Sequence, residues 1–285
     1  MFWALKIKSK IFCILPRGLS IRIGKMIGYF LYYFIPLRKR VALMNLKIAF
    51  PNKNNSEINY ILKKCYVHFG IIISEFLRLP KLNENNISNI LKLDSNTQSL
   101  LDSNNPAIIM TAHLGNWELF LPVFGYNNYK ASGVAQIQRN KSGEKFFHWI
   151  RNVKNTKIIL KGNSIKSINK VLNDKYHLIL VSDQNAGKRG TLNNLFNMPT
   201  STPKGAAILN VKNNTPIIIS FIAMNEDYTY SIFSKELCLN FNDKSTEEKV
   251  FAINEAYNKE IEKIIIKYPE QYFWFHKKWN KKDYK

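Results

Sequence analysis

The chain has 285 residues, of which 46% are hydrophobic, 42 are Lys or Arg and 20 are Asp or Glu, so its formal net charge is +22. An apolar fraction of this size supports a full core and excludes a disordered, collagen-like or low-complexity protein. The three cysteines show no C-x-x-C spacing, which argues against a disulfide framework or a structural zinc site and favours a reducing compartment.

The N-terminal residues are basic and aromatic. Eleven Lys or Arg residues precede the first acidic residue, Glu57. The run 26–37 is apolar and uncharged for twelve residues, fewer than the roughly 20 that a membrane-spanning helix needs. No small-residue cleavage site of a signal peptide follows it. We therefore expect residues 1–56 to form a segment that lies on an anionic membrane surface; an ordinary core helix with a basic flank is the alternative.

Next along the chain, residues 57–79 form a predicted amphipathic helix. Apolar residues recur there at spacings of three and four, and Pro80 ends the pattern. Residues 81–105 are polar and Asn-rich, which is typical of short helix and loop. We place the start of a second unit, residues 57–285, at this helix.

From Pro106 onward, short apolar runs alternate with helical stretches. The predicted strands are 107–111, 131–135, 157–160, 178–182, 216–223 and 228–233. The predicted helices are 117–124, 143–153, 164–173, 204–211 and 246–268. This alternation predicts an α/β fold with a mixed, largely parallel sheet flanked by helices, in which the last two strands can form a hairpin.

The most informative run follows the first predicted strand and reads His113-Leu-Gly-Asn-Trp-Glu118. Open α/β sheets bind ligands at the carboxyl ends of their strands. His113 and Glu118 can meet if the histidine lies in the loop and the glutamate in the first helical turn, a bend that Gly115 permits. A carboxylate at one imidazole nitrogen would orient the ring, so that the other nitrogen could remove a proton from a hydroxyl. A single histidine and glutamate at this spacing are also compatible with a buried structural histidine.

The His113–Glu118 run resembles the H-x-x-x-x-[DE] box of the lipid A biosynthesis (lauroyl/myristoyl) acyltransferase family, within the lysophospholipid-acyltransferase-like superfamily. Four further segments resemble family motifs in the same order, namely 45–51 (Asn-Leu-Lys-Ile-Ala-Phe-Pro), 182–184 (Ser-Asp-Gln), 196–205 (Phe-Asn-Met-Pro-Thr-Ser-Thr-Pro-Lys-Gly) and 269–279 (Pro-Glu-Gln-Tyr-Phe-Trp-Phe-His-Lys-Lys-Trp). The chain departs from the family pattern at Ser182 and Asn197, where the family has Pro and Gly. The resemblance covers nearly the whole chain and implies a glycerolipid-acyltransferase-like fold.

The resemblance implies transfer of a fatty acyl chain from an acyl carrier protein or coenzyme A thioester to a hydroxyl of a membrane lipid. It makes His113 the general base and Glu118 its orienting partner. It also implies that Arg151, Asp183 and the adjacent Gln184 position substrate. Arg139 competes with Arg151 for the role of the family arginine, and we keep both as candidate substrate-binding residues.

Our interpretation is an O-acyltransferase that uses neither a metal nor a cofactor beyond the thioester co-substrate. Its expected place is the cytoplasmic face of a bacterial inner membrane, and its expected partners are an acyl carrier protein, anionic membrane lipids and a lipid A precursor or another lipid acceptor, without nucleic acid. A phospholipid or aminolipid O-acyltransferase is the nearest alternative. A basic RNA-binding protein and a non-catalytic membrane scaffold are more distant ones.

Overall fold

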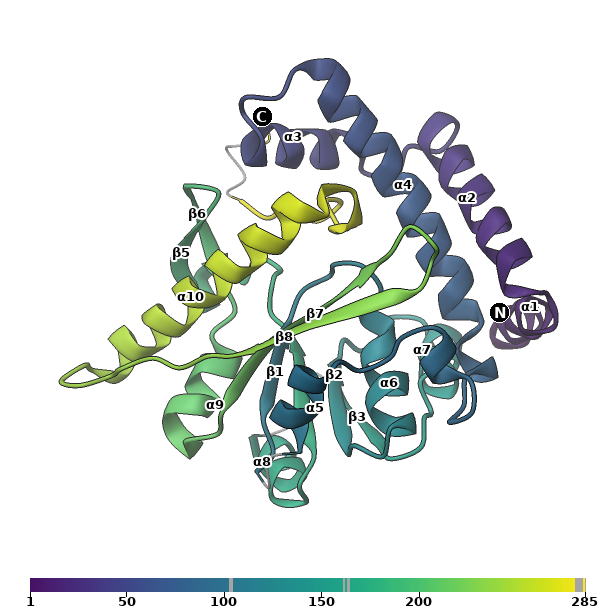
Figure 1. Ribbon diagram of the computed structural model, residues 1–285. Helices are drawn as coiled ribbons and strands as arrows, with labels where there is room; N and C mark the ends of the chain where they lie inside the picture. Colours follow the sequence, from purple (N-terminus) through teal and green to yellow (C-terminus); the bar gives the residue numbers. More distant parts are fainter. Residues whose placement is uncertain (103–104, 161, 163–164, 280–283, 285) are drawn as a thin grey trace.

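The central element of the fold is a six-stranded sheet with strand order β3-β2-β4-β1-β7-β8 (Figure 1). A computed structural model describes all residues except 103–104, 161, 163–164, 280–283 and 285. The strands of the sheet are β1 (Ile108–Thr111), β2 (Ala131–Ala135), β3 (Thr156–Leu160), β4 (His177–Val181), β7 (Ile217–Met224) and β8 (Tyr230–Glu236). Neighbouring strands are parallel except for β7 and β8, which form an antiparallel hairpin. A separate hairpin consists of β5 (Thr191–Leu195) and β6 (Met198–Thr202).

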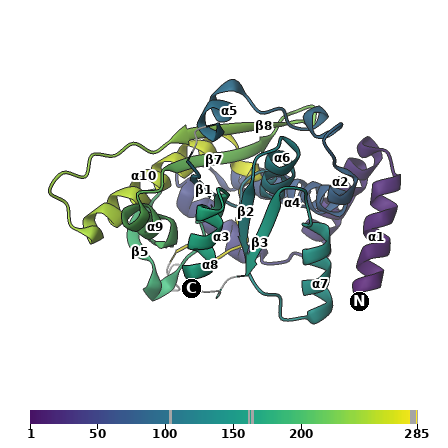
Figure 2. The same cartoon turned by 90° about the horizontal axis from the view of Figure 1, so that it is seen from below.

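Helices cover both faces of the sheet (Figures 1 and 2). One face packs against α5 (Ser95–Leu101), α6 (Phe120–Tyr126) and α7 (Lys141–Ile150). The other packs against α8 (Ile165–Asn173), α9 (Gly205–Asn213), α10 (Thr246–Lys267), α3 (Lys39–Ala49) and α4 (Asn55–Leu77). Short 3₁₀ helices comprise Leu79–Lys81, Ile87–Asn89, Trp117–Leu119, Gly187–Arg189 and Pro269–Gln271.

Two apolar cores form because successive side chains of a strand point to opposite faces. In β1, Ile108 and Met110 belong to the core under α4 and α10, whereas Ile109 belongs to the core under α6. All four residues of β1 are buried, as expected for a central parallel strand. The strand that carries the candidate site is therefore held from both faces.

Helices α1 (Phe2–Ile14) and α2 (Arg17–Tyr33) pack on the side of α4 that faces away from the sheet (Figure 1). The α2–α4 crossing is a contact between backbones. A Cβ atom added to Gly24 or Gly28 would lie 2.8 Å or less from backbone atoms of α4, and one on Gly70 would lie 2.2 Å from the Gly24 carbonyl oxygen. Arg17 also contacts Glu75, with Nη2 3.0 Å from Oε2. Of the helices that the structure describes, none has the length and hydropathy to cross a bilayer.

The predicted fold class is confirmed: the sheet is mixed and mostly parallel, and helices flank it. Each predicted strand corresponds to an observed one with ends shifted by at most three residues. The predicted start of α8 at residue 164 lies outside the described residues. The predicted helix 57–79 ends two residues early, at Leu77, because the residue before Pro80 is disfavoured in α-helix. The β5–β6 hairpin was not predicted.

Candidate active site

His113 lies in a tight turn immediately after β1. Gly115 in this turn has φ 56°, and a Cβ atom there would lie 1.8 Å from the Ile222 carbonyl oxygen. The Asn116 amide donates to the same oxygen at 3.2 Å. Both the backbone conformation and the space therefore require glycine at this position. The turn is fixed against β7 with the imidazole at the carboxyl end of β1.

The C-terminal segment pairs with this turn. Leu114 and Tyr272 form an isolated antiparallel bridge, and the Phe273 amide donates to the His113 carbonyl oxygen at 2.9 Å. The Gln271 carbonyl accepts from the Gly115 amide at 2.9 Å, while its side-chain amide bonds both backbone groups of Met224 at 2.8 Å. The histidine motif and the terminal motif thus form one backbone network around His113.

Asp183 is the ion-pair partner of His113. It follows β4, which is the neighbour of β1 in the sheet, so both strands deliver their side chains to the same edge. Nδ1 of His113 lies 2.7 Å from Oδ1 of Asp183, and the two side chains are 22% and 4% exposed. Among the described residues Nε2 of His113 has no hydrogen-bond partner. The geometry leaves Nε2 available to a ligand.

Each member of the pair shifts the pKa of the other toward its charged form: the pKa of His113 is raised and that of Asp183 is lowered. Burial would lower the pKa of His113, but the charge and hydrogen bond of Asp183 outweigh it and raise that pKa. Burial would raise the pKa of Asp183, but the charge and hydrogen bond of His113, with the charge of Lys278, bring it down to about 2. Asp183 is therefore ionised at neutral pH, and it stabilises the protonated imidazole.

Glu118 does not hold His113, contrary to the role expected from the sequence. Its carboxylate forms a bidentate pair with Arg151, in which Nε lies 2.9 Å from Oε2 and Nη2 lies 2.6 Å from Oε1. Glu118 lies in the 3₁₀ turn Trp117–Leu119, where the tertiary structure brings the Arg151 guanidinium to it, and a guanidinium matches both carboxylate oxygens at once. The charge of Glu118 still contributes to raising the pKa of His113, after the larger contribution of Asp183.

Arg151 and Arg139, the two competing arginines, have different environments. Arg151 ends α7, is 19% exposed at its side chain, and also lies over the ring of Phe147 at 4.8 Å. Attraction to Glu118 outweighs its burial and raises its pKa. Arg139 is exposed in the segment between β2 and α7. Gln184 is half-buried beside Asp183. The structure therefore brings Arg151, but not Arg139, into an ion pair with Glu118.

An aromatic surface lies beside the imidazole. The Trp117 and Phe273 ring centroids are 5.0 and 5.9 Å from that of His113. Phe273 continues to Phe69 of α4 at 5.4 Å. All three aromatic side chains are half-buried, so part of each ring remains accessible. Trp117 belongs to the histidine motif and Phe273 to the terminal motif, and their contact follows from the fold alone.

His68 connects α4 to the same turn. Its Nε2 lies 3.3 Å from the Gly115 carbonyl oxygen, which can only accept, so Nε2 carries the proton. Burial lowers the pKa of His68 to about 4 and keeps the ring neutral. This histidine supports the turn rather than joining the ion pair.

Sequence reasoning missed Lys278 as a neighbour of the ion pair. The side chain is 2% exposed, and its ammonium group donates to the Asp183 carbonyl oxygen. The only signal in the sequence was its place in the His-Lys-Lys-Trp end of the terminal motif, where a lysine would ordinarily be taken as a surface residue.

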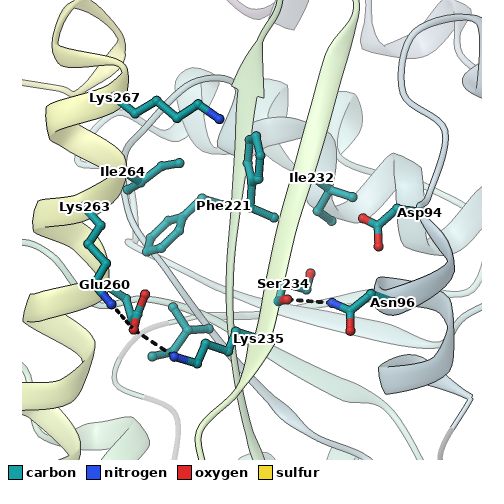
Figure 3. A pocket seen from close by; sticks show the side chains of 12 residues that line it. Asp94, Asn96, Phe221, Ile232, Ser234, Lys235, Glu260, Lys263, Ile264 and Lys267 are labelled. Carbon is teal, nitrogen blue, oxygen red and sulfur yellow. Dashed lines mark hydrogen bonds and ion pairs between the residues drawn. The ribbon is translucent and has the colours of Figure 1, made fainter.

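A separate pocket of about 400 Å³ lies between α10 and the β7–β8 hairpin (Figure 3). Phe221, Ile232 and Ile264 contribute its apolar lining, and Glu260 accepts hydrogen bonds from Lys235 and Lys263 at its rim. None of the six sequence-predicted site residues lines it. This pocket is distinct from the His113 site.

The arrangement around His113 can perform general-base chemistry. A carboxylate fixes Nδ1, and Nε2 of the partly exposed ring can take a proton from a bound hydroxyl. Glu118 with Arg151 supplies a second ion pair, and the aromatic surface can accommodate an apolar chain.

No individual curated protein matches the chain significantly. The chain matches the sequence profile of the bacterial lipid A biosynthesis acyltransferases over residues 1–281. The match includes the His113 turn, the Asp183 segment and the terminal segment that pairs with the turn. From this coverage, the chain belongs to the bacterial lipid A biosynthesis acyltransferase family.

Proposed function

We propose that this acyltransferase of lipid A biosynthesis moves a fatty acyl chain from a thioester to a hydroxyl of a lipid A precursor, with His113 as the general base. The proposal is carried by the 2.7 Å contact between Nδ1 of His113 and Oδ1 of the buried Asp183. The His113 side chain itself is 22% exposed, so a substrate can reach it. Family membership supports the acyl-transfer chemistry.

In the proposed reaction, Nε2 of His113 removes the proton from the acceptor hydroxyl as its oxygen attacks the thioester carbonyl carbon. The tetrahedral intermediate collapses, the carbon–sulfur bond breaks, and the thiolate takes the proton from the imidazolium. An ester and a free thiol result, and no covalent acyl-enzyme forms. Asp183 keeps Nδ1–H oriented and stabilises the transient imidazolium. The reacting groups in this scheme are the acceptor hydroxyl, the thioester and the imidazole of His113.

We assign the surrounding residues to substrate positioning. Trp117, Phe273 and Phe69 form the surface against which the acyl chain lies. Arg151, oriented by Glu118, presents the remaining donor capacity of its guanidinium to an anionic group of the donor or acceptor. Gln184 and Arg139 remain candidate contacts. An acyl carrier protein is the proposed donor because an acidic carrier suits a chain of net charge +22; coenzyme A is the alternative.

The proposed place of action is a membrane surface that α1 and α2 contact. On α1, Trp3, Ile7, Ile11 and Ile14 follow one stripe and are between 50% and 81% exposed. On α2 and just after it, the exposed apolar residues are Leu19, Met26, Tyr29, Phe30, Tyr33, Phe34, Ile35 and Leu37. Basic residues are interspersed with them, and no acidic residue occurs before Glu57. Apolar burial and attraction to anionic headgroups would then act together.

Replacing Trp3, Ile7 and Ile11 together with Ser is expected to weaken binding to phosphatidylglycerol vesicles by about 10³-fold or more, since each buried apolar side chain contributes about 1.5–3 kcal/mol. Vesicle co-sedimentation measures the effect. The matched control is Leu192→Ser with Ile266→Ser, which removes side chains that are 67% and 62% exposed elsewhere. High salt should release the wild type only in part. Equal sedimentation of both variants would show that α1 is not the attachment surface.

The functional proposal is tested by lipid mass spectrometry of cells with and without the protein. We expect lipid A precursors to gain the mass of one acyl chain only in cells that contain it. If phospholipids or aminolipids gain the acyl mass and lipid A precursors do not change, the acceptor is a phospholipid or aminolipid instead.

A further inference from the structure

Lys278 places an ammonium group inside the protein directly behind the candidate site. Its side chain is 2% exposed, and Nζ donates to the backbone carbonyl oxygen of Asp183. The Lys278 backbone carbonyl accepts from Nδ2 of Asn185 at 2.8 Å and from Oγ1 of Thr200 at 2.9 Å. The lysine is therefore fixed at both ends, and its neighbour Lys277 is exposed.

The buried carboxylate of Asp183 needs a positive charge nearby in every step of the reaction. When His113 is protonated, the imidazolium provides that charge at 2.7 Å. When His113 is neutral and able to act as a base, Lys278 is the buried cation whose charge still acts on Asp183. A buried anion without such a partner is costly. In the described part of the chain, the other ionisable groups that interact electrostatically with these three residues are Glu118, Arg151, Tyr257, Tyr272 and His276.

We propose that Lys278 is a positioning residue of this active site, whose ammonium group holds Asp183 against His113 and balances its charge while the imidazole is unprotonated. The proposal rests on the proposed role of His113 as the base, and it adds a third, buried member to the pair.

The expected consequence follows from coupled titration. Burial lowers the pKa of Lys278 to about 8, against the attraction of Asp183, so the ammonium is charged at neutral pH. Without that charge, the negative charge of Asp183 is less well balanced. A proton on the carboxylate, or on the imidazole beside it, is then held more strongly. The last proton would then leave the His113–Asp183 pair at a higher pH, and less of the base would be available at neutral pH.

The test substitutes Lys278→Gln, which keeps a hydrogen-bond donor and removes the charge. His113 is followed by NMR in isotope-labelled histidine, one of five in the chain, and is assigned by the signal missing in His113→Gln. We expect its titration midpoint to rise by about one pH unit. The acid limb of kcat/KM should move by the same amount, so the rate on that limb falls about tenfold and recovers at higher pH. A purely structural defect would lower the rate equally at all pH values.

Two variants serve as controls. Lys278→Arg keeps the charge and should restore the wild-type titration of His113, and Lys277→Gln removes a charge from the exposed neighbour and should leave titration and activity unchanged. A His113 titration in Lys278→Gln that equals the wild type would overturn the proposal.

If Lys278→Gln does not fold, the proposal is tested by titrating the wild-type protein. The Lys278 amine, assigned by the signal lost in Lys278→Arg, must stay protonated through the pH range in which His113 titrates; loss of its proton before His113 would overturn the proposal. The NMR readout needs no turnover. A shifted titration in a protein that transfers no acyl chain would therefore refute the proposed function alone, and normal acyl transfer with an unshifted titration would refute the role of Lys278 alone.

Discussion

Replacing His113 with Ala is expected to reduce the rate of acyl transfer by roughly 10²- to 10⁴-fold, the usual contribution of a positioned general base. The loss should be in kcat, because the aromatic surface and Arg151 that we assign to substrate positioning remain in place. The initial rate of ester formation from an acyl thioester and a lipid A precursor measures the effect.

The matched control for this variant is His148→Ala. His148 is exposed on α7 and has the same side chain without the carboxylate partner. It should transfer the acyl chain at the wild-type rate. Near-normal turnover in His113→Ala, with a folded protein, would mean that the ion pair is not part of the reaction and would remove the basis of the proposed mechanism.

The parts of the fold that follow from local pattern could be predicted. In β1 the continuous apolar run reads as a strand buried on both faces, and in α10 the spacing of Val250, Ile253, Tyr257 and Ile261 reads as a helix face. A Ser245 cap with Glu248 three residues later marks the start of α10 correctly. These signals depend only on neighbouring residues, which is why they could be read without the tertiary structure.

The β5–β6 hairpin could not be predicted because its turn lacks the usual residues. Phe196 and Asn197 occupy the two central positions with φ 52° and 56°, where Asn-Gly is the common pair. The ring centroid of Phe196 lies 5.6 Å from that of Phe50, which is distant in sequence. This packing stabilises Phe196 in a left-handed backbone conformation that is unfavourable for phenylalanine. Asn197 stands where the family has Gly, and asparagine is one of the few non-glycine residues that adopt left-handed φ readily.

The pairing of charges at the site depends on strand order, which the sequence does not contain. His113, Asp183, Glu118 and Arg151 were all identified as site residues, but the sequence joined His113 to Glu118 through their spacing. In the structure β4 lies directly beside β1, with Val181 opposite Thr111, and this places Asp183 at the imidazole. Arg151, which follows α7, then forms the ion pair with Glu118. Long-range register therefore determined which carboxylate became the partner.

Asp183→Asn and Glu118→Gln should consequently have different effects on the pH–rate profile. Asp183 is the larger contributor to the raised pKa of His113, so its replacement should lower that pKa and move the acid limb of kcat/KM to lower pH. The maximal rate should fall by roughly 10²- to 10⁴-fold, because a neutral amide neither fixes the Nδ1–H tautomer nor stabilises the imidazolium. Each replacement keeps the size of the side chain.

Glu118→Gln should move the acid limb in the same direction but less, since Glu118 acts on His113 only through its charge. Its main effect is to leave the Arg151 guanidinium without its bidentate carboxylate, so we expect a higher KM rather than a large loss of kcat. Asp174→Asn is the matched control, because it removes a carboxylate from an ion pair with Lys157 in which both side chains are more than 40% exposed, and it should leave the profile unchanged. A larger shift of the acid limb in Glu118→Gln than in Asp183→Asn would show that Glu118, not Asp183, is the working partner of His113 during turnover.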